Sequence, residues 1–272
     1  MNAGRRLPLL IVVIAAIGVA AIALLYWGIP SAPVDLGRRL AAPGSGAWLG
    51  TDQLGRDLGH RLVLGAPWSL GVAVAATLIA ASLGIAVGLA AGELDGIPRR
   101  VLLQLVNLTL SFPGLVAAMA AVAILGQSNT AVFLVLGLLS WPVFARVCYA
   151  ETLTIKVRAY VMAARIGGVR RHVLLWRHVL PALAPSLIAM VAFHFAEMLV
   201  ASSALSFLGI GAPLGSPAWG AMLSESRPYL YQAPWMLVAP AAALAGTVLA
   251  LNLWGEFIAR NLAGEGRIGV RA

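Results

Sequence analysis

Two ionisable side chains lie inside one long apolar stretch of the chain. His194 and Glu197 stand three residues apart within residues 186–208, which are otherwise mostly aliphatic, aromatic and small. Residues at this spacing share one face of a helix, and an ionisable residue within a membrane-spanning helix is costly and therefore a functional candidate. The pair could mark a polar point on a substrate path, facing an amine or a metal chelate, or form a satisfied contact with a neighbouring helix. One histidine and one glutamate are too few for a metal site, and none is expected.

A second polar point precedes a proline in another apolar stretch. Pro113 predicts a kink within residues 101–125 and a freed backbone carbonyl. Asn107 and Thr109 come shortly before it and could line the same passage. Many membrane helices carry such prolines for packing alone, so both interpretations stay open.

Residues 160–181 carry a different kind of signal, a short basic segment between apolar stretches. Tyr160–Ile166 can form two helical turns, which Gly167 and Gly168 would end. A second amphipathic stretch follows, and Pro181 is expected to interrupt it. In the first helix Ala163 and Ala164 would let another backbone approach closely, and Arg165 beside them offers charge-assisted contacts. The segment predicts a helix that docks into a partner's groove or, alternatively, one that lies on anionic headgroups.

The chemistry of ATP hydrolysis is absent from the sequence. No GxxxxGK[ST] pattern occurs, and the single lysine, Lys156, follows Ile155. HExxH, GxSxG and paired-cysteine motifs are also missing. We therefore expect no enzyme activity and no cofactor bound by this chain. Any energy source would be an ion gradient or another polypeptide.

The composition identifies the environment in which these segments fold. Hydrophobic residues make up 61% of the 272 residues and charged residues 11%, with a mean hydropathy of +0.91. A soluble domain has about a quarter charged residues, so the chain is expected to be an integral membrane protein in contact with the lipid bilayer. The net charge of +9 does not indicate nucleic-acid binding, because the cations fall between apolar runs. The single cysteine, Cys148, excludes an intrachain disulfide.

Six apolar stretches are long enough to cross a bilayer as helices. The sequence therefore predicts an all-α protein with six spans, at about residues 8–27, 69–91, 101–125, 131–148, 186–208 and 235–257. The first apolar run is longer than the h-region of a signal peptide, and we interpret it as a retained anchor.

The cations predict the orientation of these spans. With the N-terminus inside, fourteen of the nineteen lie in inner segments and five in outer segments, so both termini are expected to be cytoplasmic. The predicted parts are residues 1–27 (tail and first anchor), 28–68 (outer segment), 69–260 (transmembrane domain) and 261–272 (tail). Within the domain, residues 149–185 form an inner connection and 209–234 a structured outer loop.

The basic segment resembles the EAA loop of ABC importer permeases. Ala163 and Ala164 match its paired alanines, Gly168 its glycine, and Leu180 with Pro181 its closing Leu-Pro. Met162 stands where that family has glutamate, and His178 takes a hydrophobic position. The missing glutamate concerns one contact at the start of the helix.

Further motifs resemble the peptide/nickel branch of that family, specifically its dipeptide-permease C-type subunit. They are WLGTDQLGRD at residues 48–57, LSFLGIG at 205–211, and the residues that follow up to Arg260, so the resemblance covers about residues 34–260. Asn107 and Ser202 depart from it, since acids are usual at both positions.

The resemblance implies a permease subunit of a bacterial cytoplasmic-membrane importer. It would pair with a second homologous permease, two cytoplasmic ATPases that hold ATP and Mg²⁺, and a substrate-binding protein. Ala163, Ala164, Arg165, Gly168, Leu180 and Pro181 would couple to the ATPases. The cargo would be di- or oligopeptides or, alternatively, nickel or a metal chelate. An ion-coupled secondary transporter is the remote alternative, and Glu197 is the clear mid-span acid for it.

Three smaller patterns have structural interpretations. Gly84, Gly88 and Gly92 recur every four residues, which is typical of tight helix contacts. The WLGTDQLGRD segment could contact a binding protein or form a turn with exposed Asp–Arg pairs that contribute little stability. Trp219 is expected to be an interfacial anchor.

Overall fold

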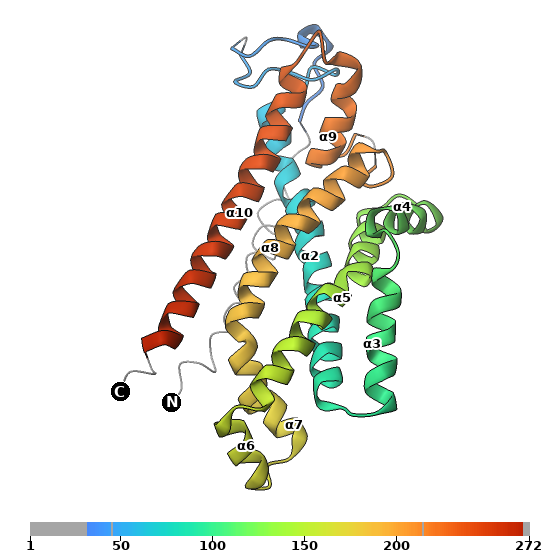
Figure 1. The fold of residues 1–272 in the computed structure, drawn as a ribbon. Helices are drawn as coiled ribbons and strands as arrows, with labels where there is room; N and C mark the ends of the chain where they lie inside the picture. The colour runs from blue at the N-terminus through green and yellow to red at the C-terminus, as the bar shows by residue number, and fades with distance from the viewer. Residues whose placement is uncertain (1–31, 45, 214, 269–272) are drawn as a thin grey trace.

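Four long helices run side by side in the protein (Figure 1). The computed structural model describes residues 32–44, 46–213 and 215–268; the predicted first span, residues 8–27, lies outside the described residues. The long helices are α2 (Leu58–Glu93), α5 (Asn129–Lys156), α8 (Leu180–Phe207) and α10 (Trp235–Ile268). The shorter ones are α3 (Ile97–Leu110), α4 (Gly114–Leu125), α6 (Ala159–Ile166), α7 (Arg171–Leu174) and α9 (Trp219–Ser226).

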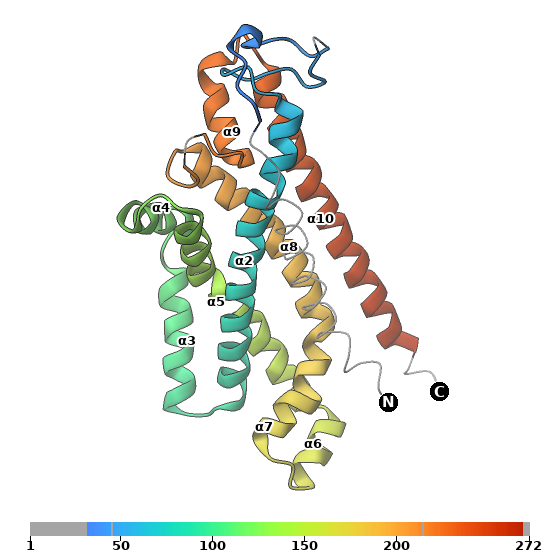
Figure 2. The same cartoon turned by 180° about the vertical axis from the view of Figure 1, so that it is seen from behind.

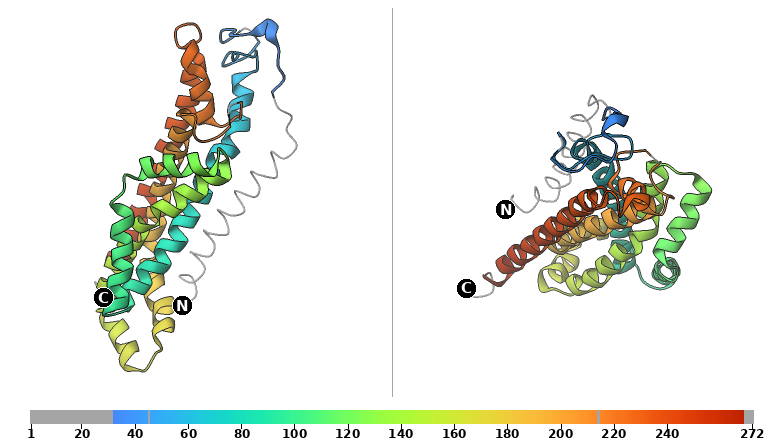
Figure 3. Two further views of the ribbon diagram at one scale, coloured as in Figure 1. Left: turned by 90° about the vertical axis from the view of Figure 1, so that its right-hand side faces the viewer. Right: turned by 90° about the horizontal axis from the view of Figure 1, so that it is seen from above.

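The two ends of this bundle differ. We call one the cap end, formed by residues 35–44 and 46–57 with α9, and the other the loop end, formed by α6, α7 and the turn between α2 and α3. They lie at the top and bottom of Figure 1 and keep these places in the view from behind (Figure 2). The side view in Figure 3 shows α2 and α10 reaching the cap end, whereas α5 starts lower, beside α4. The α9 helix lies within the segment 209–234 that the sequence predicted as a structured connection.

The described residues contain four helices long and apolar enough to cross a membrane, or five with α3 and α4 as one broken span. Five of the six predicted spans fall within the described residues, and each of these five overlaps one of the four long helices or the α3–α4 pair. The predicted span 101–125 is not one helix, because α3 and α4 meet at 83°. Pro113 is the residue before the first turn of α4. Its missing N–H and fixed φ break the helix here rather than only bending it.

The helices extend beyond the apolar stretches that predicted them. α2 has 36 residues, about 54 Å at 1.5 Å per residue, and it takes up residues 58–68 of the predicted outer segment. The Asp57 side chain caps it by accepting from the backbone N–H of His60 at 3.0 Å. Likewise α5 continues to Lys156 and α8 starts at Leu180, which shortens the predicted inner connection 149–185. Hydropathy marks only the lipid-matched part of a helix.

Pro181 does not interrupt the second amphipathic stretch, contrary to the sequence-based expectation. A π turn, Leu175–Val179, joins α7 to α8, and Arg171–Phe207 forms one span-length helical stretch. In this turn the N–H of Leu180 donates to the carbonyl of Leu175, five residues back. The shifted ladder accommodates a residue that has no N–H of its own.

The three glycines in α2 lie against α5, as the small-residue pattern predicts. A Cβ on Gly84 would come within 2.4 Å of the Trp141 carbonyl oxygen, and one on Gly88 within 2.5 Å of the Cys148 Cβ. A Cβ on Gly92 would lie 2.5 Å from the Thr152 Cγ2. At these three positions there is no room for a side chain on α2, so the two helices lie close together and form one packed unit.

Candidate functional site

The helix predicted at the basic segment is α6, and it protrudes at the loop end (Figure 1). Val161 is fully buried in a cluster with Leu89, Leu174 and other apolar residues, which anchors one face. The opposite face exposes Met162 and Ala163, and Ile166 is 84% exposed. A short helix that presents an alanine and uncovered apolar side chains at the end of a bundle has the form of a docking element.

The turn after α6 depends on a glycine. Gly167 follows the last helical residue. Gly168 has φ +76°, and a Cβ at this position would have nothing within 4 Å. Glycine reaches this left-handed conformation without strain, whereas other residues do not. The sequence pattern therefore located both the end of the helix and the residue that makes the turn possible.

An acidic residue that the sequence reasoning missed holds α6 against α2. Both carboxylate oxygens of Glu93, which is 8% exposed, accept from Arg165 Nη2 at 3.2 Å. Arg171 Nε lies 3.9 Å from the same carboxylate, and Lys156 Nζ donates to the Gly92 carbonyl at 2.9 Å. Arg165 thus makes an ion pair within its own chain while remaining half-exposed. The signal in the sequence that could have revealed this pair was the group of cations at 156–171, together with Glu93 at the end of an apolar stretch.

The closing residues of the motif lie away from this protruding helix. Leu180 and Pro181 start α8 and are partly buried. Leu180 packs against the same apolar cluster that holds Val161. They therefore lie beside the apolar cluster that anchors α6.

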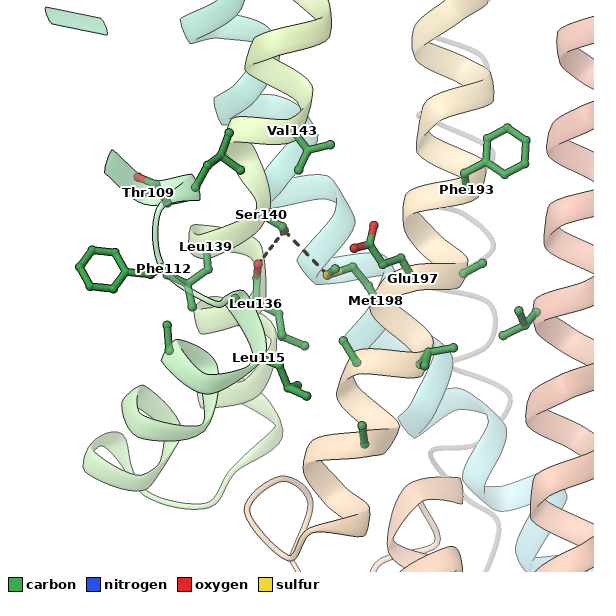
Figure 4. Close-up of a pocket in the computed structure, with 18 of the residues that line it drawn as sticks. Thr109, Phe112, Leu115, Leu136, Leu139, Ser140, Val143, Phe193, Glu197 and Met198 are labelled. Atoms are coloured by element: carbon green, nitrogen blue, oxygen red, sulfur yellow. Dashed lines mark hydrogen bonds between the residues drawn. The ribbon is translucent and has the colours of Figure 1, made fainter. Parts of the chain in front are cut away.

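A cleft of about 750 Å³ opens between α5, α8 and the junction of α3 with α4 (Figure 4). Its walls are mostly apolar, with Phe112, Leu139 and Phe193 among the larger side chains. The polar lining residues are Thr109, Ser140, Glu197 and Asn252. The volume falls within the range of small-molecule sites.

The predicted pair, His194 and Glu197, is brought together, but the two residues differ in their access to this cleft. His194 Nδ1 lies 3.2 Å from Glu197 Oε2, and its Nε2 lies 3.2 Å from Ser140 Oγ. His194 is 3% exposed, and its ring meets Phe144 edge-on with centroids 4.9 Å apart. The Glu197 side chain is 66% exposed and points into the space between α5 and α8 (Figure 4). Glu197 therefore lines the cleft, and His194 holds it from behind.

The other two predicted pathway residues do not line this cleft. Asn107 is exposed, and its Oδ1 accepts from Arg146 Nη2 at 3.1 Å. Pro113 stands between two lining residues, Phe112 and Gly114, and shapes the rim by breaking the helix. Thr109 does line the cleft.

The cap end holds a buried ion cluster that the sequence reasoning placed at the surface. We call Asp52, Arg56, Arg61 and Glu225 the cap cluster. Asp52 Oδ2 lies 2.6 Å from Arg56 Nε and 2.8 Å from Arg61 Nη1, which also lies 2.9 Å from Glu225 Oε2. The expected Asp–Arg pairing is present, but Asp52 is 0% and Arg61 3% exposed. The expectation of weak, exposed pairs is therefore wrong, because α9 covers the turn.

Glu225 shows the electrostatic balance of this cluster. Burial alone would raise the pKa of its carboxyl group. The hydrogen bond and positive charge of Arg61, with hydrogen bonds from Gln53 and the Gly215 backbone, lower the pKa below its ordinary value. The attraction thus outweighs the cost of burial.

Trp219 is not an interfacial anchor, contrary to the prediction. It is 5% exposed and packs in the main apolar cluster of the bundle. Its Nε1 donates to the Leu62 carbonyl at 2.9 Å, and its backbone N–H donates to Ser69 Oγ at 3.0 Å. Both partners belong to α2, so the indole fixes α9 onto that helix.

Within the described part of the chain, no group of three or more histidine, cysteine or acidic side chains is arranged to hold a metal ion. The polar features of that part are instead the Glu93–Arg165 pair at α6, the cleft and the cap cluster.

Comparisons with known proteins agree with the resemblance seen in the sequence. The model of the family described as binding-protein-dependent transport system inner membrane component matches residues 84–264. The chain is 35% identical over 222 residues to the glutathione transport system permease protein GsiD of Pectobacterium atrosepticum, covering 82% of this chain and 74% of the relative. It is 37% identical over 209 residues to GsiD of Escherichia coli, covering 77% and 69%.

The fold is also similar to a solved structure. A chain of the MetNI methionine ABC transporter in an inward-facing conformation matches with a TM-score of 0.62 and 18% identity. The match covers 74% of this chain and 96% of that chain. At this identity the likeness concerns the fold alone.

Proposed function

The chain belongs to the family of binding-protein-dependent transport system inner membrane components, and we propose that it supplies half of the membrane pathway of an ATP-driven peptide importer. A second homologous permease completes the pathway. Two ABC ATPases, which bind ATP and Mg²⁺, dock on the loop end, and a substrate-binding protein delivers cargo at the cap end. The chain itself binds no cofactor in this scheme.

The observation that carries the proposal is the exposed face of α6. Ala163 and the turn at Gly168 leave a surface that another protein's groove can approach closely. The uncovered Met162 and Ile166 add apolar area to that surface. A helix left bare in this way at the end of a packed bundle is explained by a partner.

Two structural links would carry ATP-driven movement from α6 into the membrane. The Glu93–Arg165 pair joins α6 to α2, which is packed on α5 through its glycines. On the other side, Arg171–Phe207 forms one helical stretch across the π turn, so α7 and α8 can act as a lever. Closure of the ATPases would rotate these units as rigid bodies and alternate the access of the cleft.

The same proposal fixes the orientation of the protein. The loop end lies in the cytoplasm and the cap end outside, with residues 8–27 as a further span and both termini inside. The cations between Lys156 and Arg177 support this, because cytoplasmic connections are enriched in lysine and arginine. The location is the bacterial cytoplasmic membrane.

Peptides are the cargo class that we favour over nickel or a metal chelate. The GsiD relatives are by name permeases for glutathione, which is a tripeptide. The cleft has room for a molecule of that size, with one carboxylate and three uncharged polar side chains among apolar walls.

Affinity purification of the chain from its native membrane in mild detergent, with mass spectrometry, tests the assembly. We expect a second permease and P-loop ATPases to co-purify and to be lost in Gly168→Arg. Gly96→Arg is the matched control, because Gly96 also has a positive φ (+71°) with open space, but in the α2–α3 turn. Loss of the ATPases in both variants, or in neither, would contradict docking through α6.

The cargo is tested by ATP hydrolysis of the purified complex with its loaded binding protein. Stimulation by di- and tripeptides supports the proposal, whereas stimulation by nickel chelates alone would assign the alternative cargo. Uptake by this chain on its own, driven by an ion gradient, would overturn the proposal in favour of a secondary transporter.

A further inference from the structure

The Glu197 carboxylate is anchored on one side and open on the other. Within the described residues, His194 is the side chain that pairs with it, at 3.2 Å. An ionised carboxylate offers about four acceptor positions. Since two thirds of the side chain is exposed toward the cleft, acceptor capacity remains for a visiting group.

The anchoring gives this carboxylate a defined direction. His194 is buried, held by Ser140 at its Nε2 and by the edge-on contact with Phe144. Ser140 Oγ also lies 2.6 Å from the Leu136 carbonyl oxygen. A chain of contacts from α5 thus fixes the imidazole, and the imidazole fixes Glu197. Rigid support of this kind distinguishes a binding group from a freely rotating surface acid.

The surroundings of Glu197 favour recognition of a positive charge. Among the residues that line the cleft it is the one with an ionisable side chain, and most of its neighbours are apolar. Charge interactions are stronger beside apolar walls than in open water. The lining residues Thr109 and Asn252 can hydrogen-bond the uncharged parts of a ligand.

We propose that Glu197 is the contact for a cationic group, a primary ammonium, on cargo passing through the cleft, and that His194 is its positioning residue. This inference rests on the proposed function, and it adds a charge requirement inside the membrane pathway. Peptides with a free amino group satisfy it, whereas N-acetylated peptides do not.

A labelling experiment tests the charge of the cleft without any transport. In a Cys148→Ala background, Val200→Cys places a thiol in the cleft lining, one turn from Glu197. Val238→Cys on α10, 60% exposed and outside the cleft, is the matched control. We expect a cationic methanethiosulfonate, relative to an anionic one, to react about tenfold faster at the first site than at the second.

The same ratio should fall to the control value when Glu197→Gln is added and should persist with Glu197→Asp. Equal ratios at the two sites in the parent chain would overturn the inference, whether or not Glu197→Gln can be purified.

Uptake by the reconstituted complex tests the role in transport. We expect Glu197→Gln to reduce uptake of Ala-Ala about tenfold or more, towards the lower rate of N-acetyl-Ala-Ala, which the substitution should leave unchanged. Comparing each peptide between variants cancels any preference of the binding protein. His194→Gln should reduce the same discrimination in part. Glu256→Gln, an acid paired with Arg260 on α10, is the control.

The two levels of failure can be separated. An equal fall for both peptides would assign Glu197 a structural role and overturn this inference, while the importer proposal stands. If the parent complex imports neither peptide, the peptide proposal fails, and the labelling ratio still decides whether the cleft attracts cations.

Discussion

Replacing Arg61 by alanine is expected to destabilise the cap end. The Arg61 guanidinium is 3% exposed and lies between two carboxylates, Asp52 at 2.8 Å and Glu225 at 2.9 Å. With Arg56 the cap cluster contains two positive and two negative groups. Removing one cation leaves a buried net negative charge, and breaking a buried pair in this way costs about 3–5 kcal/mol.

The measurement is reversible unfolding of the purified chain in mild detergent, with tryptic cleavage after Arg38 or Arg39 as a local readout. We expect Arg61→Ala to lower the free energy of unfolding by the amount above and to speed cleavage. Arg99→Ala is the control, because Arg99 and Asp95 form an exposed pair at 3.4 Å. Its loss should change stability by less than about 1 kcal/mol.

A second variant isolates the charge from the lost packing. Arg61→Ala combined with Glu225→Gln restores neutrality, since Asp52 keeps Arg56 at 2.6 Å. The double variant should therefore be more stable than Arg61→Ala alone. If its loss equals or exceeds the sum of the two single losses, the buried-charge reasoning is wrong.

Three further perturbations test the pH response of the cap cluster and two other parts of the structure. The pKa of Glu225 is lowered in the folded chain. Its contribution to stability is therefore present above the ordinary pKa of 4.5 and is lost as pH falls through the folded pKa. In unfolding experiments at a series of pH values, Glu225→Gln should flatten the loss of stability on the acid side. Gly88→Val should lower the free energy of unfolding by about 1–3 kcal/mol through overpacking, since its Cβ would lie 2.5 Å from the Cys148 Cβ. Gly71→Val, whose Cβ would have nothing within 4 Å, should lower it less. Equal losses of stability in thermal unfolding would refute the tight contact. Glu93→Gln should lower transport per ATP hydrolysed several-fold with the ATPases still bound, because its charged contact with Arg165 is weakened. Asp95→Asn is the matched control. An unchanged amount of transport per ATP in Glu93→Gln would argue against a coupling role of the Glu93–Arg165 pair.

Local sequence signals predicted the helix α6 and the tight pair of α2 with α5 well. Gly167 and Gly168 end α6 because backbone freedom is a property of the residues themselves. The glycines at 84, 88 and 92 share one helix face whatever the rest of the chain does. The apolar stretches likewise located most of each long helix, although they missed its polar ends.

The errors concern features that depend on distant residues. Arg61 and Glu225 are 164 residues apart, so no local pattern could show that α9 buries the Asp–Arg turn. Trp219 was expected at the interface for the same reason. Pro113 permits either a kink or a full break in a helix, and only the packing around α3 and α4 decides between them.

The separation of Glu225 from the other three members of the cap cluster along the chain also has a consequence for biogenesis. Asp52, Arg56 and Arg61 are synthesised within a few residues of one another, but the second carboxylate follows 164 residues later. At about 5–20 residues per second, that delay is on the order of 10–30 s. Until then the three groups hold a surplus positive charge, and the cap end cannot close.

We therefore expect residues 35–57 of a nascent chain to stay open to protease until α9 has been made, which pulse labelling with timed proteolysis would measure. The first described segment of the protein therefore reaches its folded state only after α9, near the end of the chain, has been synthesised.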